Sequence, residues 1–283
     1  MIKQTSKREV FEEIAKQVAQ GDLMFPTGAQ VALNLRRALD DPECHILTAA
    51  KLIQAEPLLS ARVIEISNSV AFNRSGREIT DVHVAVSLLG FTTIRSLAMA
   101  LVTRQMAGQS KTREHQEVVD RLWEHSAHVA SLARAIARHV THVDQETALF
   151  AGIIHEIGGF YMLSRSEEYP GLLEDDFSEW LEGGEVAVGR QVLIRLKVPQ
   201  SVLAMMESFW DGFLAMPPVT LADTLLLAEE LATVPSPLHR VDSKSPGSEL
   251  RASIEMVIGE ETLTLILAEA AEEIESLTRA LKF

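Results

Sequence analysis

Apolar residues recur with a period close to 3.6 along almost the whole of this chain. Between residues 5 and 20, for example, Phe11, Ile14 and Val18 share one stripe, and charged side chains occupy the positions between them. Such a stripe is typical of an amphipathic helix. No stretch alternates apolar and polar residues for long enough to predict a half-buried strand. The sequence therefore predicts an all-α protein.

Proline, glycine and clusters of short polar residues mark the ends of the expected helices, as at Asp40-Asp41-Pro42 and at Gly90. Together with the periodicity, these signals predict helices at residues 5–20, 29–40, 46–55, 58–68, 80–89, 91–107, 114–140, 144–157, 176–182, 185–196, 199–210, 218–233 and 248–281.

The expected helices are short up to residue 107 and become longer after it. We predict two packed helical lobes, an N-terminal lobe of residues 1–110 and a C-terminal lobe of residues 111–283, with the boundary in the stretch Met106–Lys111. Residues 234–248 hold three prolines and few apolar side chains. That composition is typical of an exposed and mobile loop.

The charge balance narrows the classes of partner. Lys and Arg number 26 against 40 Asp and Glu, which gives a formal net charge of −14. Proteins that bind nucleic acid usually carry a basic surface, so we expect no nucleic-acid partner. Acidic charge on amphipathic helices favours contact with another protein instead. The sequence does not indicate the oligomeric state.

Cysteine usage and hydropathy bear on the compartment. The single cysteine, Cys44, excludes an intrachain disulfide and suits a reducing environment. The N-terminus shows no apolar signal-peptide core, and the apolar stretches are shorter than the roughly 20 residues that span a bilayer. We therefore expect a cytoplasmic protein without a membrane partner.

Four residues are candidate metal ligands: His125, the adjacent pair His155 and Glu156, and Asp223. Imidazole nitrogen together with carboxylate oxygen suits divalent zinc, manganese, iron or magnesium. Adjacent residues in a helix point about 100° apart, so His155 and Glu156 can share an ion only near a helix end. The same four residues also fit ordinary, satisfied polar side chains, and from the residues alone both interpretations stay open.

The spacing of these residues resembles a known pattern. His125, the segment Gly152–Gly158 and Asp223 are similar to the spaced His, His-Asp and Asp of the HD metal-dependent phosphohydrolase superfamily. That resemblance implies a helical lobe that holds one or two divalent ions in the active members.

A narrower resemblance comes from the first third of the chain. The segments Ala55–Val63, Ile66–Ser69 and Val86–Gly90 are similar to the signature blocks of the HDOD domain, and the likeness extends over roughly residues 22–232. It implies a helical N-terminal lobe followed by an HD-like lobe. It also implies a role as an output module of bacterial signalling, usually without hydrolase activity.

The chain departs from the metal-binding pattern of the active HD proteins. Glu156 replaces the aspartate, Glu185 stands where the next histidine is expected, and Phe209-Trp210 stand where a His-His pair is expected. The Gly-Tyr-Pro motif of cyclic-dinucleotide phosphodiesterases is absent. Aromatic side chains cannot ligate a metal, and the longer glutamate displaces its oxygens from the ion position. We therefore expect a degenerate site with no catalytic residues.

Any ion in that degenerate site would be a single divalent cation held by His125, His155, Glu156 and Asp223, with Glu185 as a further candidate. We expect no metal and no other cofactor. The expected function is that of a non-catalytic HDOD-type signalling module that acts through a protein partner. The alternatives are a metal-dependent phosphohydrolase or phosphodiesterase, and a nucleotide sensor that uses the remaining pocket.

Asn68 and Ser69 end an expected apolar helix inside one of the HDOD-like blocks. Short polar side chains at such a position can bond backbone groups and hold the loop that follows. We expect them to lock the end of the helix rather than to contact a ligand.

Overall fold

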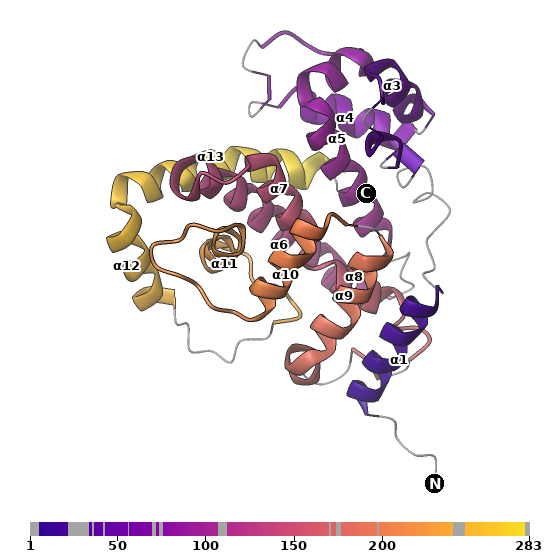
Figure 1. The fold of residues 1–283 in the computed structure, drawn as a ribbon, viewed down its shortest axis with the longest axis vertical. Coiled ribbons are helices and arrows are strands. Elements are labelled where there is room, and N and C mark those ends of the chain that lie inside the picture. The colour runs from indigo at the N-terminus through magenta and orange to yellow at the C-terminus, as the bar shows by residue number, and fades with distance from the viewer. Residues whose placement is uncertain are drawn as a thin grey trace.

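A computed structural model shows a chain folded into helices (Figure 1). The described residues are 6–21, 34–35, 37–41, 43–55, 57–69, 72–73, 76–106, 112–169, 171–173, 177–196, 198–239 and 247–280. No strand occurs among them, which confirms the all-α prediction.

The helices follow the chain in the order α1 (Lys7–Gln20), α3 (Ile46–Gln54), α4 (Pro57–Ser67), α5 (Val82–Met106), α6 (Arg113–Ile136), η1 (Ala137–Thr141), α7 (Gln145–Ile154), α8 (Ile157–Ser164), η2 (Trp180–Gly184), α9 (Glu185–Arg195), α10 (Gln200–Trp210), α11 (Leu221–Leu231), α12 (Gly247–Ile258) and α13 (Glu260–Ala280). The two elements η1 and η2 are short π-helical turns. The expected helix at 29–40 lies partly outside the described residues, although residues 34–35 and 37–39 are helical.

The helices α3, α4 and the first half of α5 form a small lobe at the top of Figure 1. In the larger part of the molecule, α6 contacts α7, α8, α11 and α13. The small lobe is joined to the rest by α5, which runs down into the larger lobe, and by α13, which contacts α4. The two helical parts are therefore packed together through shared helices.

Gly90 divides α5 into two segments. Its backbone has φ 76° and ψ 163°, a conformation open to glycine and rare for other residues. This confirms the predicted separation of helices 80–89 and 91–107. By length and composition alone, Val82–Thr103 is long and apolar enough to cross a membrane, but most of this stretch is buried inside the molecule, as in a core helix.

The first helix does not belong to the small lobe. Helix α1 packs against α9 and η2, and the ring of Phe11 lies edge-on to Trp180 with the ring centroids 5.2 Å apart. The predicted N-terminal lobe of residues 1–110 is therefore wrong for α1. The predicted boundary falls largely on residues 107–111, which lie outside the described ones. An amphipathic stripe shows which face of a helix is buried, but not which helix covers it.

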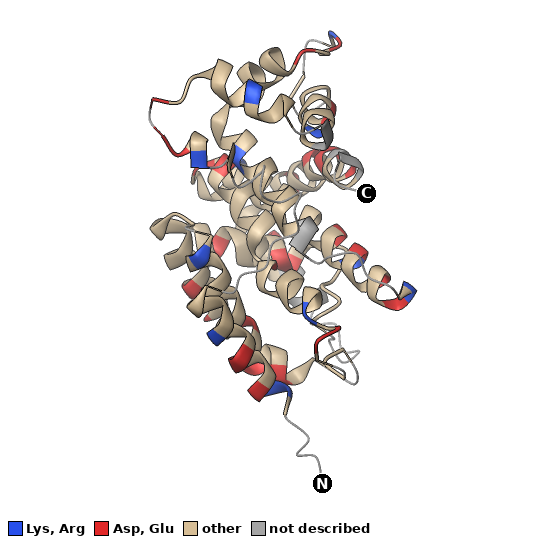
Figure 2. Cartoon of the chain, turned by 90° about the vertical axis from the view of Figure 1, so that its right-hand side faces the viewer, with Lys and Arg blue, Asp and Glu red and all other residues tan. Residues whose placement is uncertain are grey.

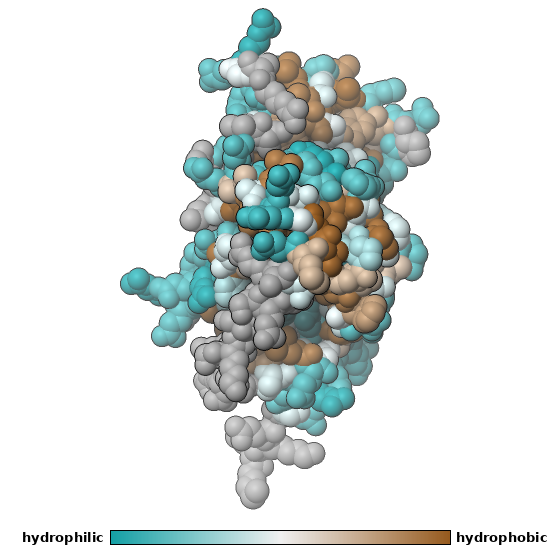
Figure 3. Space-filling view, turned by 90° about the vertical axis from the view of Figure 1, so that its left-hand side faces the viewer, coloured by the Kyte–Doolittle hydropathy of each residue, from teal (hydrophilic) through white to brown (hydrophobic). Residues whose placement is uncertain are grey.

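The C-terminal segment also differs from the prediction. The expected single helix at 248–281 consists of α12 and α13, separated at Gly259, whose φ is 86°. At the side of the molecule that carries α12 and the connector before α11, apolar side chains gather on the surface (Figure 3). The exposed large apolar residues of these two elements include Phe213, Met216, Val219 and Met256. Viewed from the opposite side, acidic and basic residues are mixed along the helices (Figure 2).

Asn68 fastens the end of α4 to the segment before α5. Its side-chain amide donates to the carbonyls of Ile64 (3.0 Å) and Ile79 (2.6 Å), and its side-chain oxygen accepts from the backbone N–H of Ile79 (2.7 Å). The hydroxyl of Ser69 donates to the carbonyl of Ile66 at 2.7 Å. Both side chains bond backbone groups, so the predicted lock of the helix end is confirmed.

Candidate metal centre

The pair His155 and Glu156 lies at a break between two helices. His155 directly follows the last residue of α7, and Glu156 directly precedes the first residue of α8. The sequence predicted one helix as far as residue 157, with the glycines after it. In the structure the break comes earlier, and Gly158 and Gly159 lie inside α8. The break places both side chains beside His125 of α6, as a shared site at a helix end requires.

Glycines allow the close helix packing that brings these side chains together. A Cβ on Gly152 of α7 would lie 2.4 Å from the Cα of Ala130 on α6, and one on Gly158 would lie 2.8 Å from the Cα of Gly189 on α9. No real Cβ is accommodated at such distances. The bare backbone at Gly152 thus brings α7 against α6 one turn before His155.

The two histidines face each other through equivalent nitrogens. The Nε2 atoms of His125 and His155 are 3.1 Å apart. Their Nδ1 atoms face backbone carbonyls, that of Val234 at 2.8 Å and that of Gly152 at 2.7 Å. Because a carbonyl only accepts hydrogen bonds, each Nδ1 carries a proton and donates it. In the neutral rings both Nε2 atoms then point lone pairs at each other, which is favourable only with a proton or a cation between them.

Glu229 of α11 is a residue of this site that the sequence did not indicate. Its Oε2 lies 3.3 Å from His125 Nε2 and 3.5 Å from His155 Nε2. Burial alone would raise the pKa of the Glu229 carboxyl, but hydrogen bonds and charge from the two histidines hold it well below its usual range. Burial alone would likewise lower the pKa of His125, but Glu229 and then Glu156 raise it above its ordinary value.

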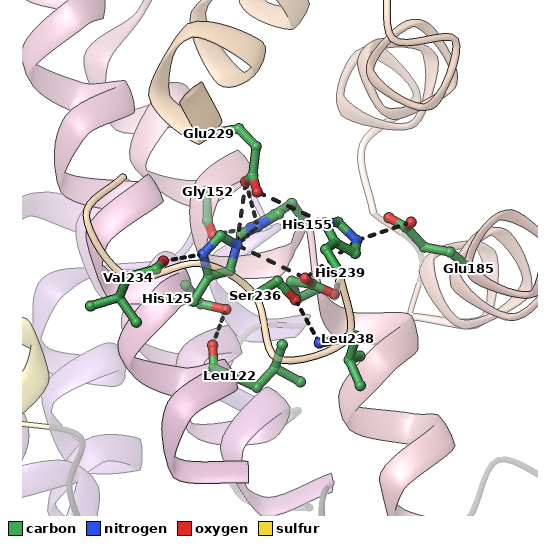
Figure 4. Close-up of polar contacts among 12 residues, drawn as sticks. Leu122, His125, Gly152, His155, Glu185, Glu229, Val234, Ser236, Leu238 and His239 are labelled. Atoms are coloured by element: carbon green, nitrogen blue, oxygen red, sulfur yellow. Dashed lines mark hydrogen bonds and ion pairs between the residues drawn. The ribbon is translucent and has the colours of Figure 1, made fainter. Parts of the chain in front are cut away.

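His239 is the second residue that the sequence did not indicate, and it approaches from the segment that follows α11 (Figure 4). Its Nε2 lies 3.5 Å from Glu185 Oε2 and 3.9 Å from Glu156 Oε1, and its Nδ1 lies 3.9 Å from Glu229 Oε1. Burial alone would lower the pKa of His239, but the hydrogen bond to Glu185 and the three carboxylates raise it to about 9. We call the whole set the donor cluster: His125, His155, Glu156, Glu185, Glu229 and His239.

The segment Val234–His239, which we call the strap, covers the donor cluster. The sequence predicted an exposed loop at 234–248, yet Ser236 and Leu238 are buried, and a Cβ on Gly159 would meet the Leu238 side chain at 2.5 Å. The expectation of exposure is therefore wrong for Ser236 and Leu238. Residues 240–246 lie outside the described ones. Prolines predicted a lack of helix correctly, but a non-helical segment can still be buried.

Asp223, which the sequence offered as a candidate metal ligand, instead accepts hydrogen bonds from the backbone at the start of α11. Its Oδ1 accepts from the backbone N–H of Ala215 at 3.0 Å, and its Oδ2 accepts from the N–H groups of Val219 (3.1 Å) and Thr220 (2.8 Å). Burial would raise the pKa of Asp223, but these bonds and the Thr220 hydroxyl lower it. Both oxygens are therefore used in holding the start of α11.

The sequence contained a signal for this role, because Thr220 and Asp223 have the spacing of a capping box, and the structure forms that box. Six residues separate Asp223 from Glu229, which places the two side chains about 120° apart around the helix. The donor that α11 supplies to the cluster is therefore Glu229.

Phe209 and Trp210, which stand where the HD pattern has a His-His pair, both lie beside the donor cluster. Phe209 is buried, and its ring meets the ring of His155 edge-on with centroids 6.0 Å apart. The indole Nε1 of Trp210 donates to Glu185 Oε1 at 3.2 Å. Neither ring ligates, but Trp210 holds one of the carboxylates of the cluster.

The donor cluster fits a divalent cation by its chemistry. Ligand atoms of His125, His155 and Glu156 lie within 4.8 Å of one another, as do those of Glu156, Glu185 and His239. Glu156 is 1% exposed, and among the described residues neither of its oxygens has a hydrogen-bond partner. Burying a carboxylate is costly unless it is paired or bound to a metal. A cation bound here would neutralise Glu156 and act as a Lewis acid.

Comparison with known protein families identifies one family that matches this chain. The HDOD domain matches residues 25–180 of this chain. No curated protein matches it.

Several solved structures share the fold. One is a protein from Shewanella amazonensis SB2B whose name describes it as a metal-dependent phosphohydrolase. The two structures have a TM-score of 0.71 at 21% sequence identity, and the match covers 98% of this chain and 99% of that protein. An HDOD domain protein of unknown function from Geobacter sulfurreducens has a TM-score of 0.60 at 20% identity, covering 96% and 97%. A protein from Marinobacter aquaeolei VT8, whose name describes it as a signal transduction protein, has a TM-score of 0.59 at 16% sequence identity. That match covers 98% of this chain and 67% of that protein. At these identities the likeness shows the fold alone.

Proposed function

Because the chain belongs to the HDOD domain family, we propose that it is a non-catalytic, cytoplasmic signal-transduction module that acts through a protein partner. Family membership and the fold support a regulatory role of the HDOD type. The proposal goes further in two respects: the donor cluster does not hydrolyse a phosphate ester, and the output of the module is a contact with another protein.

The closure of the donor cluster carries the first part of the proposal. The side chains of His125 and His155 are 1% exposed and that of Glu156 is 0% exposed. Metal-dependent hydrolysis needs an open coordination position that water and a phosphate oxygen can reach. Here the strap lies over one side of the cluster and Phe209 packs against His155. The burial of these three donors among the described residues supports a site without hydrolytic activity.

A hydrolysis assay tests this part. The full chain is incubated with manganese or magnesium and, in turn, with a cyclic dinucleotide, a nucleoside triphosphate and bis(p-nitrophenyl) phosphate. We expect no turnover above that of the His155→Ala variant. Turnover that His155→Ala abolishes would overturn the proposal.

The convergence of three histidines and three carboxylates favours one alternative, a metal-dependent phosphohydrolase. In that case His125, His155, Glu156 and Glu229 would hold the ion and the strap would have to move aside. The same assay separates the two functions, because only the hydrolase would lose activity in the His155→Ala variant.

A groove supports the second part of the proposal. It has a volume of about 360 Å³ and lies between α6, α11 and α13. Its lining is mainly apolar and includes Leu132, Leu231, Leu267, Ala270 and Ile274, with Glu275 at one wall. An apolar groove in a protein of net charge −14 is complementary to an amphipathic helix that carries Lys or Arg beside its apolar anchors. We assign the partner contact to such a helix.

Peptide binding tests this assignment. We expect an amphipathic helical peptide of Leu and Lys to bind more tightly than its Leu and Glu counterpart, and Ile274→Glu to weaken that binding at least tenfold, as followed by fluorescence anisotropy. Leu265→Glu is the matched control, because Leu265 lies on the same helix, is 50% exposed and does not line the groove. Equal loss in both variants, or equal binding of both peptides, would contradict the assignment.

A further inference from the structure

The strap is fastened to the donor cluster at both of its ends. At its start, the carbonyl of Val234 accepts the Nδ1–H of His125 at 2.8 Å. At its end, the ring of His239 lies among the carboxylates of Glu156, Glu185 and Glu229. Between them, Leu238 is fully buried. Residues that follow α11 thus complete the surroundings of side chains from α6, α7 and α9.

We propose that Glu229 and His239 complete a buried divalent-cation site with His125, His155 and Glu156, and that the bound cation holds the strap in place. Glu185, Glu229 and His239 all lie outside residues 25–180, which match the HDOD domain. Glu229 and His239 occupy positions that the resemblance to HD proteins did not assign to ligands. The inference concerns binding and therefore stands or falls independently of the proposed lack of catalysis.

The distances around the two histidines agree with a shared ion. Two ligand atoms bound at about 2.0–2.1 Å to one tetrahedral ion lie about 3.3 Å apart. The Nε2 atoms of His125 and His155 are 3.1 Å apart, and Glu229 Oε2 lies 3.3 Å and 3.5 Å from them. These three atoms form a triangle of the size that one face of such a coordination shell requires.

The buried polar atoms point to the same conclusion. Both oxygens of Glu156 are buried, and among the described residues neither has a hydrogen-bond partner. The buried Oε2 of Glu229 and Nε2 of His239 have only contacts of 3.3 to 3.9 Å to the other members of the cluster. Native proteins leave few buried polar atoms unsatisfied, and a bound ion is one way in which such atoms are satisfied. Glu156 belongs to both groups of ligand atoms, so it joins the histidine pair to the strap.

The ligand types define the cation. Imidazole nitrogens and carboxylate oxygens together suit zinc, manganese and iron, whereas magnesium and calcium prefer oxygen ligands alone. In His125 and in His155, the hydrogen bond from Nδ1–H to a backbone carbonyl already fixes the ring orientation and the tautomer that a metal ligand needs. We therefore expect a transition-metal ion rather than an alkaline-earth ion.

The cation would also act on the partner groove through two consecutive residues. Thr233 lines the groove and its hydroxyl lies 3.1 Å from His128 Nδ1, while Val234 begins the strap. A cation that holds His239 and Glu229 therefore also sets the position of the groove wall. Loss of the ion would release the strap and this wall together.

Metal titration tests the site. Full-length protein is stripped with a chelator, and zinc or manganese binding is measured by calorimetry with elemental analysis of the reloaded protein. We expect at least one equivalent per chain, and a loss of affinity of about tenfold or more in His239→Ala and in Glu229→Gln. His115→Ala is the matched control, because His115 lies on α6, contacts Ser166 and belongs neither to the donor cluster nor to the groove.

Hydrogen exchange tests the effect on the strap. We expect zinc to slow amide exchange in peptides that cover residues 234–239 of the unsubstituted chain and of His115→Ala, but not of His239→Ala. Thermal unfolding of each variant without metal shows whether it folds. Two outcomes would overturn the inference. One is that the folded, unsubstituted chain binds no metal, and the other is that His239→Ala and Glu229→Gln bind metal and protect the strap as well as the unsubstituted chain does. Hydrolytic activity does not enter this test.

Discussion

Helix α6 carries two buried groups of charged side chains, and the distances within their ion pairs differ. Arg134 donates to Glu146 and to Glu273 at 2.6 Å each, and Glu146 also accepts from the Thr93 hydroxyl at 2.7 Å. In the donor cluster, His125 is separated from its carboxylate neighbours by 3.3 to 3.9 Å. Arg134 follows His125 by nine residues, so the two groups lie on opposite faces of the helix, about 13 Å apart along its axis.

The difference distinguishes a structural ion network from a ligand site. The Arg134 group joins α6 to α7, α13 and α5 through contacts at hydrogen-bond distance, and its guanidinium also lies over the ring of Phe72 at 4.4 Å. The donor cluster brings more donors together at longer distances and leaves both oxygens of Glu156 without hydrogen bonds from the described residues. Short pairs hold helices together, whereas longer separations leave room for an ion.

The largest expected effect is the loss of the Arg134 network. Arg134→Met leaves the carboxylates of Glu273 and Glu146 without their cation, and Glu273 is 5% exposed. Removing one partner of a buried pair costs about 3–5 kcal/mol, and we expect that decrease in the free energy of unfolding measured with urea. The double variant Arg134→Met with Glu273→Met should recover part of the loss. An unchanged stability in the single variant would contradict a structural role for this network.

A smaller effect is expected where helix packing positions the donor cluster. In Gly152→Ala the new Cβ would lie 2.4 Å from the backbone of Ala130, so α7 must move away from α6. We expect a destabilisation of about 1–3 kcal/mol and weaker zinc binding, because His155 follows Gly152 by one turn. Gly212→Ala is not a suitable control because its φ is positive. Ala151→Gly on the same helix measures the cost of a backbone change without added volume.

Asp223 is a buried carboxylate whose hydrogen bonds are complete, and it sharpens the contrast with Glu156. We expect Asp223→Asn to lower the free energy of unfolding by about 1 kcal/mol at neutral pH, a typical cost for a lost cap. The pKa of Asp223 is lowered in the folded chain, so its contribution is present above the unfolded value of about 3.9 and is lost as pH falls below it. The difference between the two proteins should therefore shrink below about pH 4. A difference that grows on acidification would contradict this role of Asp223.

The smallest expected effect on stability is that of replacing Glu156, and without metal this substitution is expected to stabilise the protein rather than to destabilise it. In chelated protein, Glu156→Gln removes a buried charge that has no hydrogen bond from the described residues, and we expect it to leave stability unchanged or to raise it by up to about 1 kcal/mol. With zinc present, the unsubstituted chain should gain stability through ligand linkage and the variant should not. Thermal unfolding with and without zinc measures both. A large loss of stability in the chelated variant would place Glu156 with the Arg134 network instead.

Local sequence signals predicted much of the fold and part of the site. The 3.6-residue period, the break at Gly90 and the lock at Asn68 depend on interactions between residues close in the chain, and the structure confirms each of them. The position of His155 and Glu156 at a helix end was predicted in the same way, although the break lies two residues earlier than expected. The capping box at Thr220 and Asp223 was equally local and could have been predicted.

The sequence by itself determined that the chain is helical and where most helices begin and end, and its resemblance to HD proteins indicated that His125, His155 and Glu156 would meet. Only the tertiary structure decided that α1 packs against α9, that Glu229 and His239 join the cluster, and that Ser236 and Leu238 of the strap are buried. The physical reason is the distance along the chain over which each kind of interaction acts. Periodicity and capping act within a few residues, whereas His239 meets Glu185 and Glu156 from a distant part of the chain, through packing that no local pattern encodes.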